Sequence, residues 1–356
     1  MNDSILKTIL ALRAQLHDCA EVSGQEVRTK ALLKQFLAQN TSLELHDCGE
    51  GFYAAHREAS PVKPAIALRA DYDALATADG TAAHLCGHDG NAAVLCGVAL
   101  CIEGQTLGRN VFLLFQPAEE TGAGAAPCCE LFDKEQIGEI YGTHNLPGFP
   151  FGQLVTRRST FACASRGLVL HFIGKPTHAA HPENGISPAP AVGQLLCDLD
   201  AIAAPERYEA MTLCTVIGCR MGEKAFGAAA ETAEVWLTLR AMRDEDLTLL
   251  LTSITDRAKA LAAQFSLGFA TEDVDVFPET RNADICVDKL VALGAKLLDE
   301  PMRWSEDFGH YLYRCPGAYF GIGSGEDYPP LHTEDFVYPD EMLKPTIETF
   351  LALINA

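Results

Sequence analysis

The sequence predicts an α/β protein whose mostly parallel sheet is flanked by helices and interrupted by a ferredoxin-like α+β domain. Three observations support this fold class. Short, continuous apolar runs recur along the chain, and polar side chains follow each of them. The pattern changes between residues 167 and 276 and then returns. The chain has 356 residues, more than the roughly 250–300 at which single cores stop growing, so two domains are expected.

Two amphipathic helices are expected before the first strong strand. In residues 1–20 the apolar residues recur at helical spacing on one face, at Ile5, Ile9, Leu12 and Leu16. The segment from Ser23 to Glu26 has the residue types of a capping box, so we expect it to open the second helix.

Four apolar runs are typical of strands buried on both faces of a parallel sheet. Ala65–Leu68 leads into Asp71 and Asp73, Val111–Phe115 into Glu119 and Glu120, Gly138–Tyr141 into His144, and Ala318–Ile322 toward His332. Ligands bind beyond the carboxyl ends of the strands in open α/β sheets, which predicts one shared site for these side chains.

The inserted segment has the order strand, helix, strand, strand, helix, strand. These elements are expected at Gly167–Phe172, Ala189–Ala204, Met211–Gly218, Ala233–Arg240, Asp244–Phe265 and Leu267–Val276. This order is the ferredoxin-like split βαβ arrangement. The predicted domains are therefore 1–166 with 277–356, and 167–276.

Composition and charge exclude several classes of protein. With 27 Lys and Arg against 48 Asp and Glu, the formal net charge is −21, and no clustered basic run is available for nucleic acid. No stretch approaches the roughly 18 apolar residues that would span a bilayer. The first twenty residues lack the features of a secretory signal, so a cytoplasmic, reducing location is expected, with most of the 13 cysteines buried as free thiols.

Cys86 and His88 stand two positions apart on a glycine-flanked turn, and a thiolate with an imidazole is a common donor pair for divalent metals. Taken alone, the pair is better explained by a packed thiol at Cys86 and a histidine that caps the next helix.

Glu119 and Glu120 follow a buried strand directly. One carboxylate can bind a metal while its neighbour stays free to take a proton. The alternative is an acidic helix start. The full set of donors is Cys86, His88, Glu120, His144 and His332, with Glu119 as a free base. Five donors exceed one tetrahedral site and fit two metal ions bridged by Cys86 or a water, with Asp71 or Asp73 holding the far nitrogen of a histidine ligand.

Several ordered blocks resemble a known family. They are Arg69–Leu75, Cys86–Gly90, Gln116–Glu120, Gly174–Pro182, Ser305–Phe308 and Leu331-His332. Together they are similar to the bacterial and plant metal-dependent amidohydrolases, which include hippurate hydrolase, N-acyl-amino-acid deacylases and auxin-conjugate hydrolases. These belong with the aminoacylase and carboxypeptidase G metallopeptidases, and the resemblance covers nearly the whole chain.

The resemblance implies a zinc-exopeptidase-like catalytic domain with two metal ions and a lid domain that forms a homodimer. It places the ligands on the five donors above and the general base on Glu119. It also implies that His178 binds substrate or stabilises an oxyanion, and that Asp307 lies near the metals or the substrate.

Two positions depart from the pattern of this family. The stretch Gly227–Ala230 stands where members carry Asn-Val-Ile-Pro, so the usual polar contact of the lid is absent. Asn91 stands where a histidine is frequent.

The predicted reaction is hydrolysis of the amide bond in an N-acyl amino acid, with two zinc or manganese ions as cofactors. One alternative is a dipeptidase or carboxypeptidase acting on short peptides. Another is a non-catalytic scaffold or binding protein, for which the Gly227–Ala230 segment is the only support.

Overall fold

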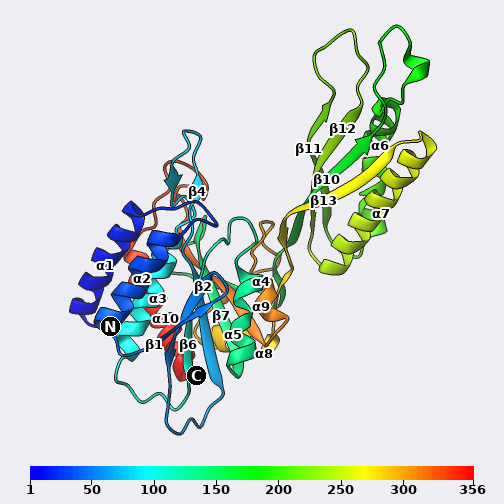
Figure 1. The fold of residues 1–356 in the computed structure, drawn as a ribbon. Coiled ribbons are helices and arrows are strands. Elements are labelled where there is room, and N and C mark those ends of the chain that lie inside the picture. Colours follow the sequence, from blue (N-terminus) through cyan, green and yellow to red (C-terminus); the bar gives the residue numbers. More distant parts are fainter. The chain divides into compact units, whose positions relative to one another are not determined.

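The computed structural model describes all 356 residues and divides into two compact units. The first unit comprises Met1–Phe161, Thr280–Met302 and Glu306–Ala356. The second comprises Ala162–Glu279 with Arg303–Ser305. The second unit is thus an insertion into the first, as the sequence colours of Figure 1 show.

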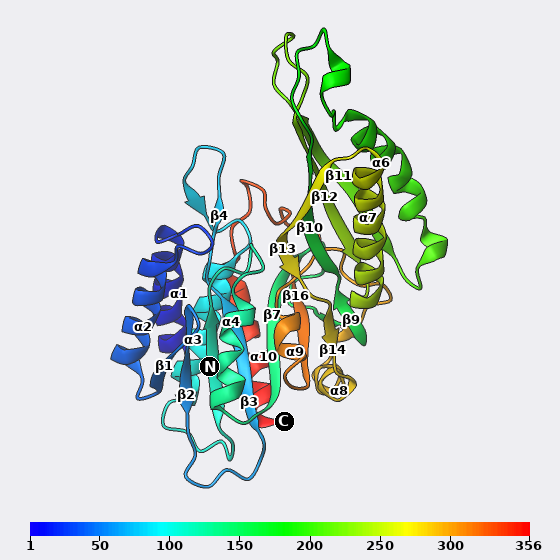
Figure 2. The ribbon, with the colours of Figure 1, turned by 45° about the vertical axis from the view of Figure 1, so that its right-hand side comes forward.

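The first unit is built on an eight-stranded sheet with the order β1-β2-β6-β3-β7-β16-β8-β15. The strands are β1 (Glu44–Cys48), β2 (Gly51–His56), β6 (Val111–Gln116), β3 (Ala65–Asp71), β7 (Ile137–Pro147), β16 (Gly317–Gly325), β8 (Leu154–Thr156) and β15 (Lys296–Leu297). The four central strands, β6, β3, β7 and β16, run parallel to one another (Figure 2). Every residue of β6 is buried, as expected for a strand covered on both faces.

Helices cover this sheet. They are α1 (Asp3–Asp18), α2 (Val27–Asn40), α3 (His88–Ile102), α4 (Ala125–Cys128), α5 (Glu130–Lys134), α8 (Asp284–Ala292), α9 (Gly309–Leu312) and α10 (Leu343–Asn355). α1 and α10 both pack on α3, which packs on β3. The approach is close at Gly97 of α3, where an added Cβ would lie 2.3 Å from the side chain of Ile347.

Two small sheets and three 3₁₀ helices complete the list of elements. The strands are β4 (Leu75–Ala76) with β5 (Ala82–Ala83) and β9 (Ser159–Ala162) with β14 (Thr280–Asn282). The 3₁₀ helices span Pro182–Asn184, Pro205–Arg207 and Asp340–Met342.

The second unit has the predicted ferredoxin-like order. Its elements are β10 (Ala164–Ile173), α6 (Ala189–Ile202), β11 (Thr212–Met221), β12 (Thr232–Ala241), α7 (Asp244–Gln264) and β13 (Gly268–Phe277). The antiparallel sheet has the order β11-β12-β10-β13. Ala233, Val235, Leu237 and Leu239 of β12 are buried, as expected for a strand with one face on the core. The predicted fold class is confirmed in both units.

Two details of the predicted elements are wrong. No capping box opens α2, because the amide of Ser23 donates to the carbonyl oxygen of Ala74 and Ser23 lies too early to cap the helix. The carboxylate of Glu21 caps the first turn of α2 instead, since it accepts from the amide of Thr29 at 2.7 Å. The strand expected at Gly138–Tyr141 is longer than predicted, because β7 extends through His144 to Pro147.

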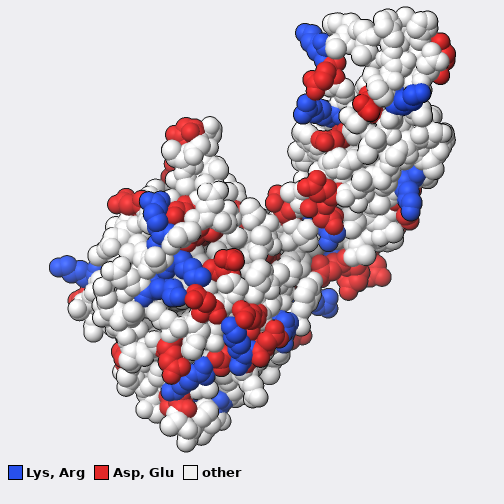
Figure 3. All heavy atoms as spheres, in the orientation of Figure 1, with Lys and Arg blue, Asp and Glu red and all other residues white.

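Lys and Arg atoms lie among Asp and Glu atoms on the face drawn in Figure 3. No helix is both long and apolar enough to cross a membrane. All thirteen cysteines are free thiols, and seven of them are buried, as predicted for most of them.

Candidate metal centre

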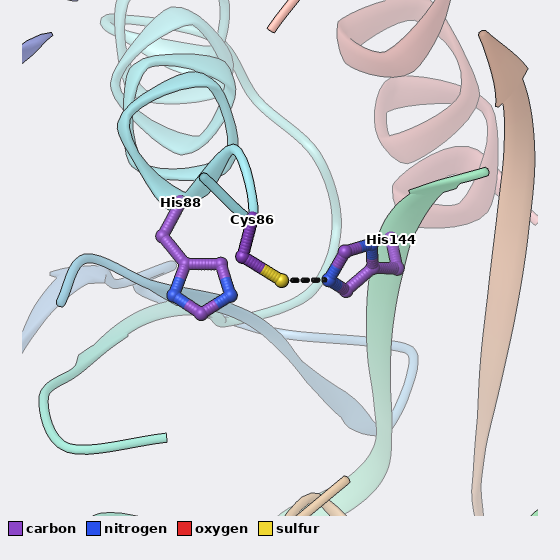
Figure 4. A group of neighbouring side chains, drawn as sticks. All are labelled: Cys86, His88 and His144. Carbon is purple, nitrogen blue, oxygen red and sulfur yellow. Dashed lines mark hydrogen bonds between the residues drawn. The ribbon is translucent and has the colours of Figure 1, made fainter. Parts of the chain in front are cut away.

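Cys86 and His88 are brought together by a turn that requires glycine. Gly87 has a φ of +89°, and a Cβ there would lie 2.8 Å from Oδ1 of Asn145. His88 is the first residue of α3, while Cys86 lies just before it. Sγ of Cys86 is 3.3 Å from Nε2 of His144, which comes from β7 (Figure 4).

Each of these histidines is oriented by a bond at its other ring nitrogen. Nδ1 of His88 donates to Oδ1 of Asp73 at 2.9 Å, and Nδ1 of His144 donates to the carbonyl oxygen of Asn145 at 2.8 Å. In neutral rings this leaves the lone pair on Nε2, the atom that faces the other donors. Such oriented imidazoles are typical of metal ligands.

Glu119 and Glu120 lie in the loop between β6 and α4, close to the same place. Oε2 of Glu119 and Oε1 of Glu120 each lie 3.9 Å from Nε2 of His88. The amide of Glu120 donates to Oδ2 of Asp73 at 3.0 Å, so one aspartate orients both a histidine and this loop. Nε2 of His332 lies 3.5 Å from Oε2 of Glu120.

Six residues therefore gather at one place, and we call them the donor cluster: Cys86, His88, Glu119, Glu120, His144 and His332. Three overlapping groups within it have ligand atoms no more than 4.8 Å apart, namely Cys86 with His88 and His144, Cys86 with Glu120 and His332, and His88 with Glu119 and Glu120. Cys86, His88 and Glu120 each belong to two of the three groups, so the groups share donors and form one continuous cluster.

The residues present fit divalent metal ions. Nε2 of His88 and Oε1 of Glu120 are buried and have no hydrogen-bond partner. Buried polar atoms without partners are costly, so their convergence is itself a sign of a missing ligand. Thiolate, imidazole and carboxylate donors together suit a zinc or manganese ion.

Electrostatics support the same conclusion. Burial, followed by the charges of Glu306 and Glu120, raises the pKa of Glu119 well above its ordinary range. Burial raises the pKa of Glu120 to about 7 and that of the Cys86 thiol well above its ordinary range. Divalent cations at this place would favour the deprotonated forms of all three groups.

The aspartates expected around the site lie at different places. Asp73 contacts His88, and Asp71 lies 3.9 Å from the Nε2 atom of the same histidine. Asp307 contacts none of the five metal donors by a hydrogen bond, and its partners are Arg69, Gln116 and the amide of Ala125.

His178 belongs to the second unit and is exposed. Its Nδ1 accepts from the amide of Ala180 at 3.0 Å, so in the neutral ring Nε2 carries the proton and can donate. The antiparallel bridge between His178 and Ala228 places this histidine beside the Gly227–Ala230 stretch.

Comparison with known proteins then identifies the family. Residues 67–356 match the family model described as peptidase family M20/M25/M40. The chain belongs to this family. The resemblance found in the sequence motifs is thereby confirmed.

Relatives and solved structures agree with that assignment. The chain is 29% identical to an N-acetyl-L-cysteine deacetylase of Bacillus subtilis strain 168, over 90% of this chain and 82% of that one. It is 27% identical to an N-acetyldiaminopimelate deacetylase of Lacticaseibacillus casei strain BL23, over 94% and 93% of the two chains. The structure of the YXEP protein of Bacillus subtilis, described as a dinuclear metal binding peptidase of family M20, shares the fold with a TM-score of 0.81, at 23% identity and covering 100% of this chain and 98% of that chain.

Proposed function

We propose that this protein hydrolyses the amide bond of N-acyl amino acids, with Cys86, His88, Glu120, His144 and His332 as ligands of two divalent metal ions and Glu119 as the general base. The observation that carries the proposal is the pair of adjacent carboxylates, Glu119 and Glu120, within one cluster of potential metal donors. The relatives described as deacetylases of N-acetyl amino acids support the substrate class.

Bound ions would supply Lewis acidity to the amide carbonyl and to a water molecule. The residues of this chain do the remaining work. Glu119 takes a proton from the attacking water and returns it to the leaving amine. Asp73 fixes the ring of His88 and the amide of Glu120, so that these two ligands keep their relative position.

His178 is proposed to bind the substrate or to donate to the developing oxyanion from Nε2. The tautomer set by the bond from Ala180 supports this role. The alanine and glycine side chains at 227–230 offer no polar group to a substrate, so the acyl preference is open to larger or more apolar groups.

The identity of the metal and the assembly of the protein extend the proposal. The thiolate of Cys86 favours zinc, whereas the carboxylate of Glu120 favours manganese, and both metals are candidates.

The domain of residues 167–276 is proposed as the lid and dimerisation domain. β11 is an edge strand of its sheet and exposes Leu213, Val216 and Ile217, which supports pairing with a second copy. A cytoplasmic location stays a prediction.

The experiment that tests the reaction is a substrate panel. Purified protein loaded with zinc or manganese is assayed on N-acetyl amino acids, on N-acyl amino acids with larger acyl groups and on dipeptides. We expect faster turnover of the N-acyl amino acids. Preferential turnover of dipeptides would favour the peptidase alternative. A protein that binds no divalent ion and turns over none of these compounds would favour the scaffold alternative.

A further inference from the structure

The loop from Gln116 to Ala125 turns back on itself around the candidate base. Ala118, directly before Glu119, has a left-handed φ of +52°. The amides of Ala123 and Gly124 both donate to the carbonyl oxygen of Ala118 at 3.1 Å. The position of Glu119 therefore depends on how the two ends of this loop are held.

Asp307 holds both ends. Its carboxylate accepts from Nε2 of Gln116, at 3.0 and 2.9 Å, where β6 ends. It also accepts from the amide of Ala125, at 2.9 Å, where α4 begins. Asp307 is fully buried, so water does not compete for these bonds. The shared carboxylate therefore sets the separation of those ends.

Arg69 links this carboxylate to the strand that supports His88. Its Nη2 donates to Asp307 at 2.9 Å, and its Nε donates to Oε1 of Gln116 at 2.8 Å. Its Nη1 donates to Asp71 at the end of β3. One guanidinium thus connects the loop that carries Glu119 to the strand end beside the metal ligand.

The surrounding polar side chains form a single network that we call the clamp cluster: Arg69, Gln116, Glu306, Asp307, Tyr311 and Tyr319. Tyr311 donates to Oε1 of Gln116 at 2.8 Å, and Tyr319 donates to Oε2 of Glu306 at 2.5 Å. Both oxygens of Asp307 already accept hydrogen bonds from this network or from the loop. Asp307 is therefore unsuited to bind a metal ion itself.

We propose that Asp307 is a positioning residue for the hydrolysis, which clamps both ends of the Gln116–Ala125 loop and thereby fixes the carboxylate of Glu119 against the donor cluster. This inference rests on the proposed function. It assigns to Asp307 an effect on the rate of the chemical step rather than on metal or substrate binding.

Glu306 provides a matched control. The carboxylate oxygens of Glu119, Glu306 and Asp307 lie within 4.8 Å of one another, so each neighbour places a carboxyl group close to the base. Glu306 also accepts from Arg69 at 2.9 Å, but its other partners are Tyr319 and the amide of Phe308, outside the loop. Glu306→Gln therefore removes a neighbouring carboxylate without releasing the loop. Asp307→Asn removes a carboxylate and also releases the loop.

The test compares Asp307→Asn, Glu306→Gln and the wild type as full-length, metal-loaded protein. Turnover of an N-acetyl amino acid gives kcat and KM, elemental analysis gives the metal content, and hydrogen exchange by mass spectrometry reports on peptides covering 116–125. For Asp307→Asn we expect kcat to fall by about 100-fold, as for a catalytic group misplaced by about 1 Å. Its KM and metal content should be unchanged and exchange in the loop should be faster. Glu306→Gln should keep kcat within a small factor of the wild type, with slow exchange in the loop.

Equal losses of kcat in the two variants, with slow exchange in both, would show that charge alone acts and would overturn the proposal. Wild-type kcat in Asp307→Asn would also overturn it. If that variant does not fold, Gln116→Met replaces it, because it releases only the β6 end and should show the same direction of change. Wild-type turnover in Glu119→Ala would refute the proposed base instead, and the exchange comparison would still decide whether Asp307 holds the loop.

Discussion

The donor cluster, which is mostly buried but includes the exposed His332, and the buried clamp cluster both contain several carboxylates, but they differ in how their buried polar atoms are satisfied. In the donor cluster, Nε2 of His88 and Oε1 of Glu120 have no hydrogen-bond partner. In the clamp cluster, every buried side-chain nitrogen and oxygen has one. Since an unpartnered buried polar group costs free energy, a fold keeps such groups where a ligand or a reaction uses them. The difference is consistent with a donor cluster that binds ligands and a clamp cluster that holds the neighbouring loop and strand in place.

The largest expected effect is a fall in kcat when Glu119 of the donor cluster is replaced. Glu119→Gln keeps the shape of the side chain but removes the base, so kcat should fall by about 10³-fold, within the range of general-base catalysis. The variant should retain its metal ions and should not melt at a lower temperature, because it removes one carboxylate from a crowded acidic site. Steady-state kinetics and elemental analysis on one preparation check this, and near-normal turnover would disprove the assignment.

The next largest effect is a fall in the free energy of unfolding when Arg69 of the clamp cluster is replaced. Arg69 is fully buried between Asp71, Glu306 and Asp307. Arg69→Met leaves these carboxylates without a cation and should lower the free energy of unfolding by about 3–5 kcal/mol. Urea unfolding of the metal-free protein measures it. Glu120→Gln is the control from the donor cluster and should leave that free energy unchanged or higher, since burial already raises the pKa of Glu120 to about 7. Equal destabilisation by both variants would remove the distinction between the clusters.

The two clusters also differ in how far the sequence predicts them. Cys86, His88, Glu119 and Glu120 stand at or just after recognisable structural elements, so their residue types and positions were enough to predict a shared site. The bond between Arg69 and Asp307 joins residues 238 positions apart, and no local pattern pairs them. Arg69 in particular directly follows the apolar run Ala65–Leu68, where the sequence alone gives it no partner.

Local rules failed where tertiary contacts overrode them. The capping box at Ser23–Glu26 was wrong because Ser23 pairs with Ala74 and the carboxylate of Glu26 accepts from the amides of Gly24 and Ala118. The strand expected at Ala233–Arg240 was predicted correctly because one face of that sheet is buried, which places apolar residues at every second position of β12.

Metal binding should stabilise the fold through the donor cluster. Ions that bind only the folded chain stabilise it by about 2.7 kcal/mol at a free concentration 100 times the dissociation constant. The melting temperature of the chelated protein should therefore rise when zinc or manganese is added. His332→Ala should weaken this rise, whereas Glu306→Gln should preserve it. A rise of the same size in His332→Ala would argue against His332 as a ligand.

The smallest effect concerns a third ionic group, formed by Glu139 of β7 with Arg109 and Lys289. Burial opposes the charged form of Glu139, but hydrogen bonds from Lys289 and Arg109 outweigh it and lower its pKa below the ordinary 4.5. Because the folded-state pKa is lowered, its stabilising contribution is present above 4.5 and is lost as the pH falls through the folded-state value. The stability difference between wild type and Glu139→Gln should be constant near neutral pH and should shrink below about pH 4.5. Urea unfolding across this range measures it, and a difference independent of pH would contradict the prediction.

The central claim is that the donor cluster binds two divalent ions that the hydrolysis requires. The most direct test measures metal content and turnover of an N-acetyl amino acid on the same sample before chelation, after chelation and after zinc or manganese is restored. We predict two ions per chain in the active protein, loss of turnover as they are removed and recovery as they return. Undiminished turnover by the metal-free chain would contradict the claim.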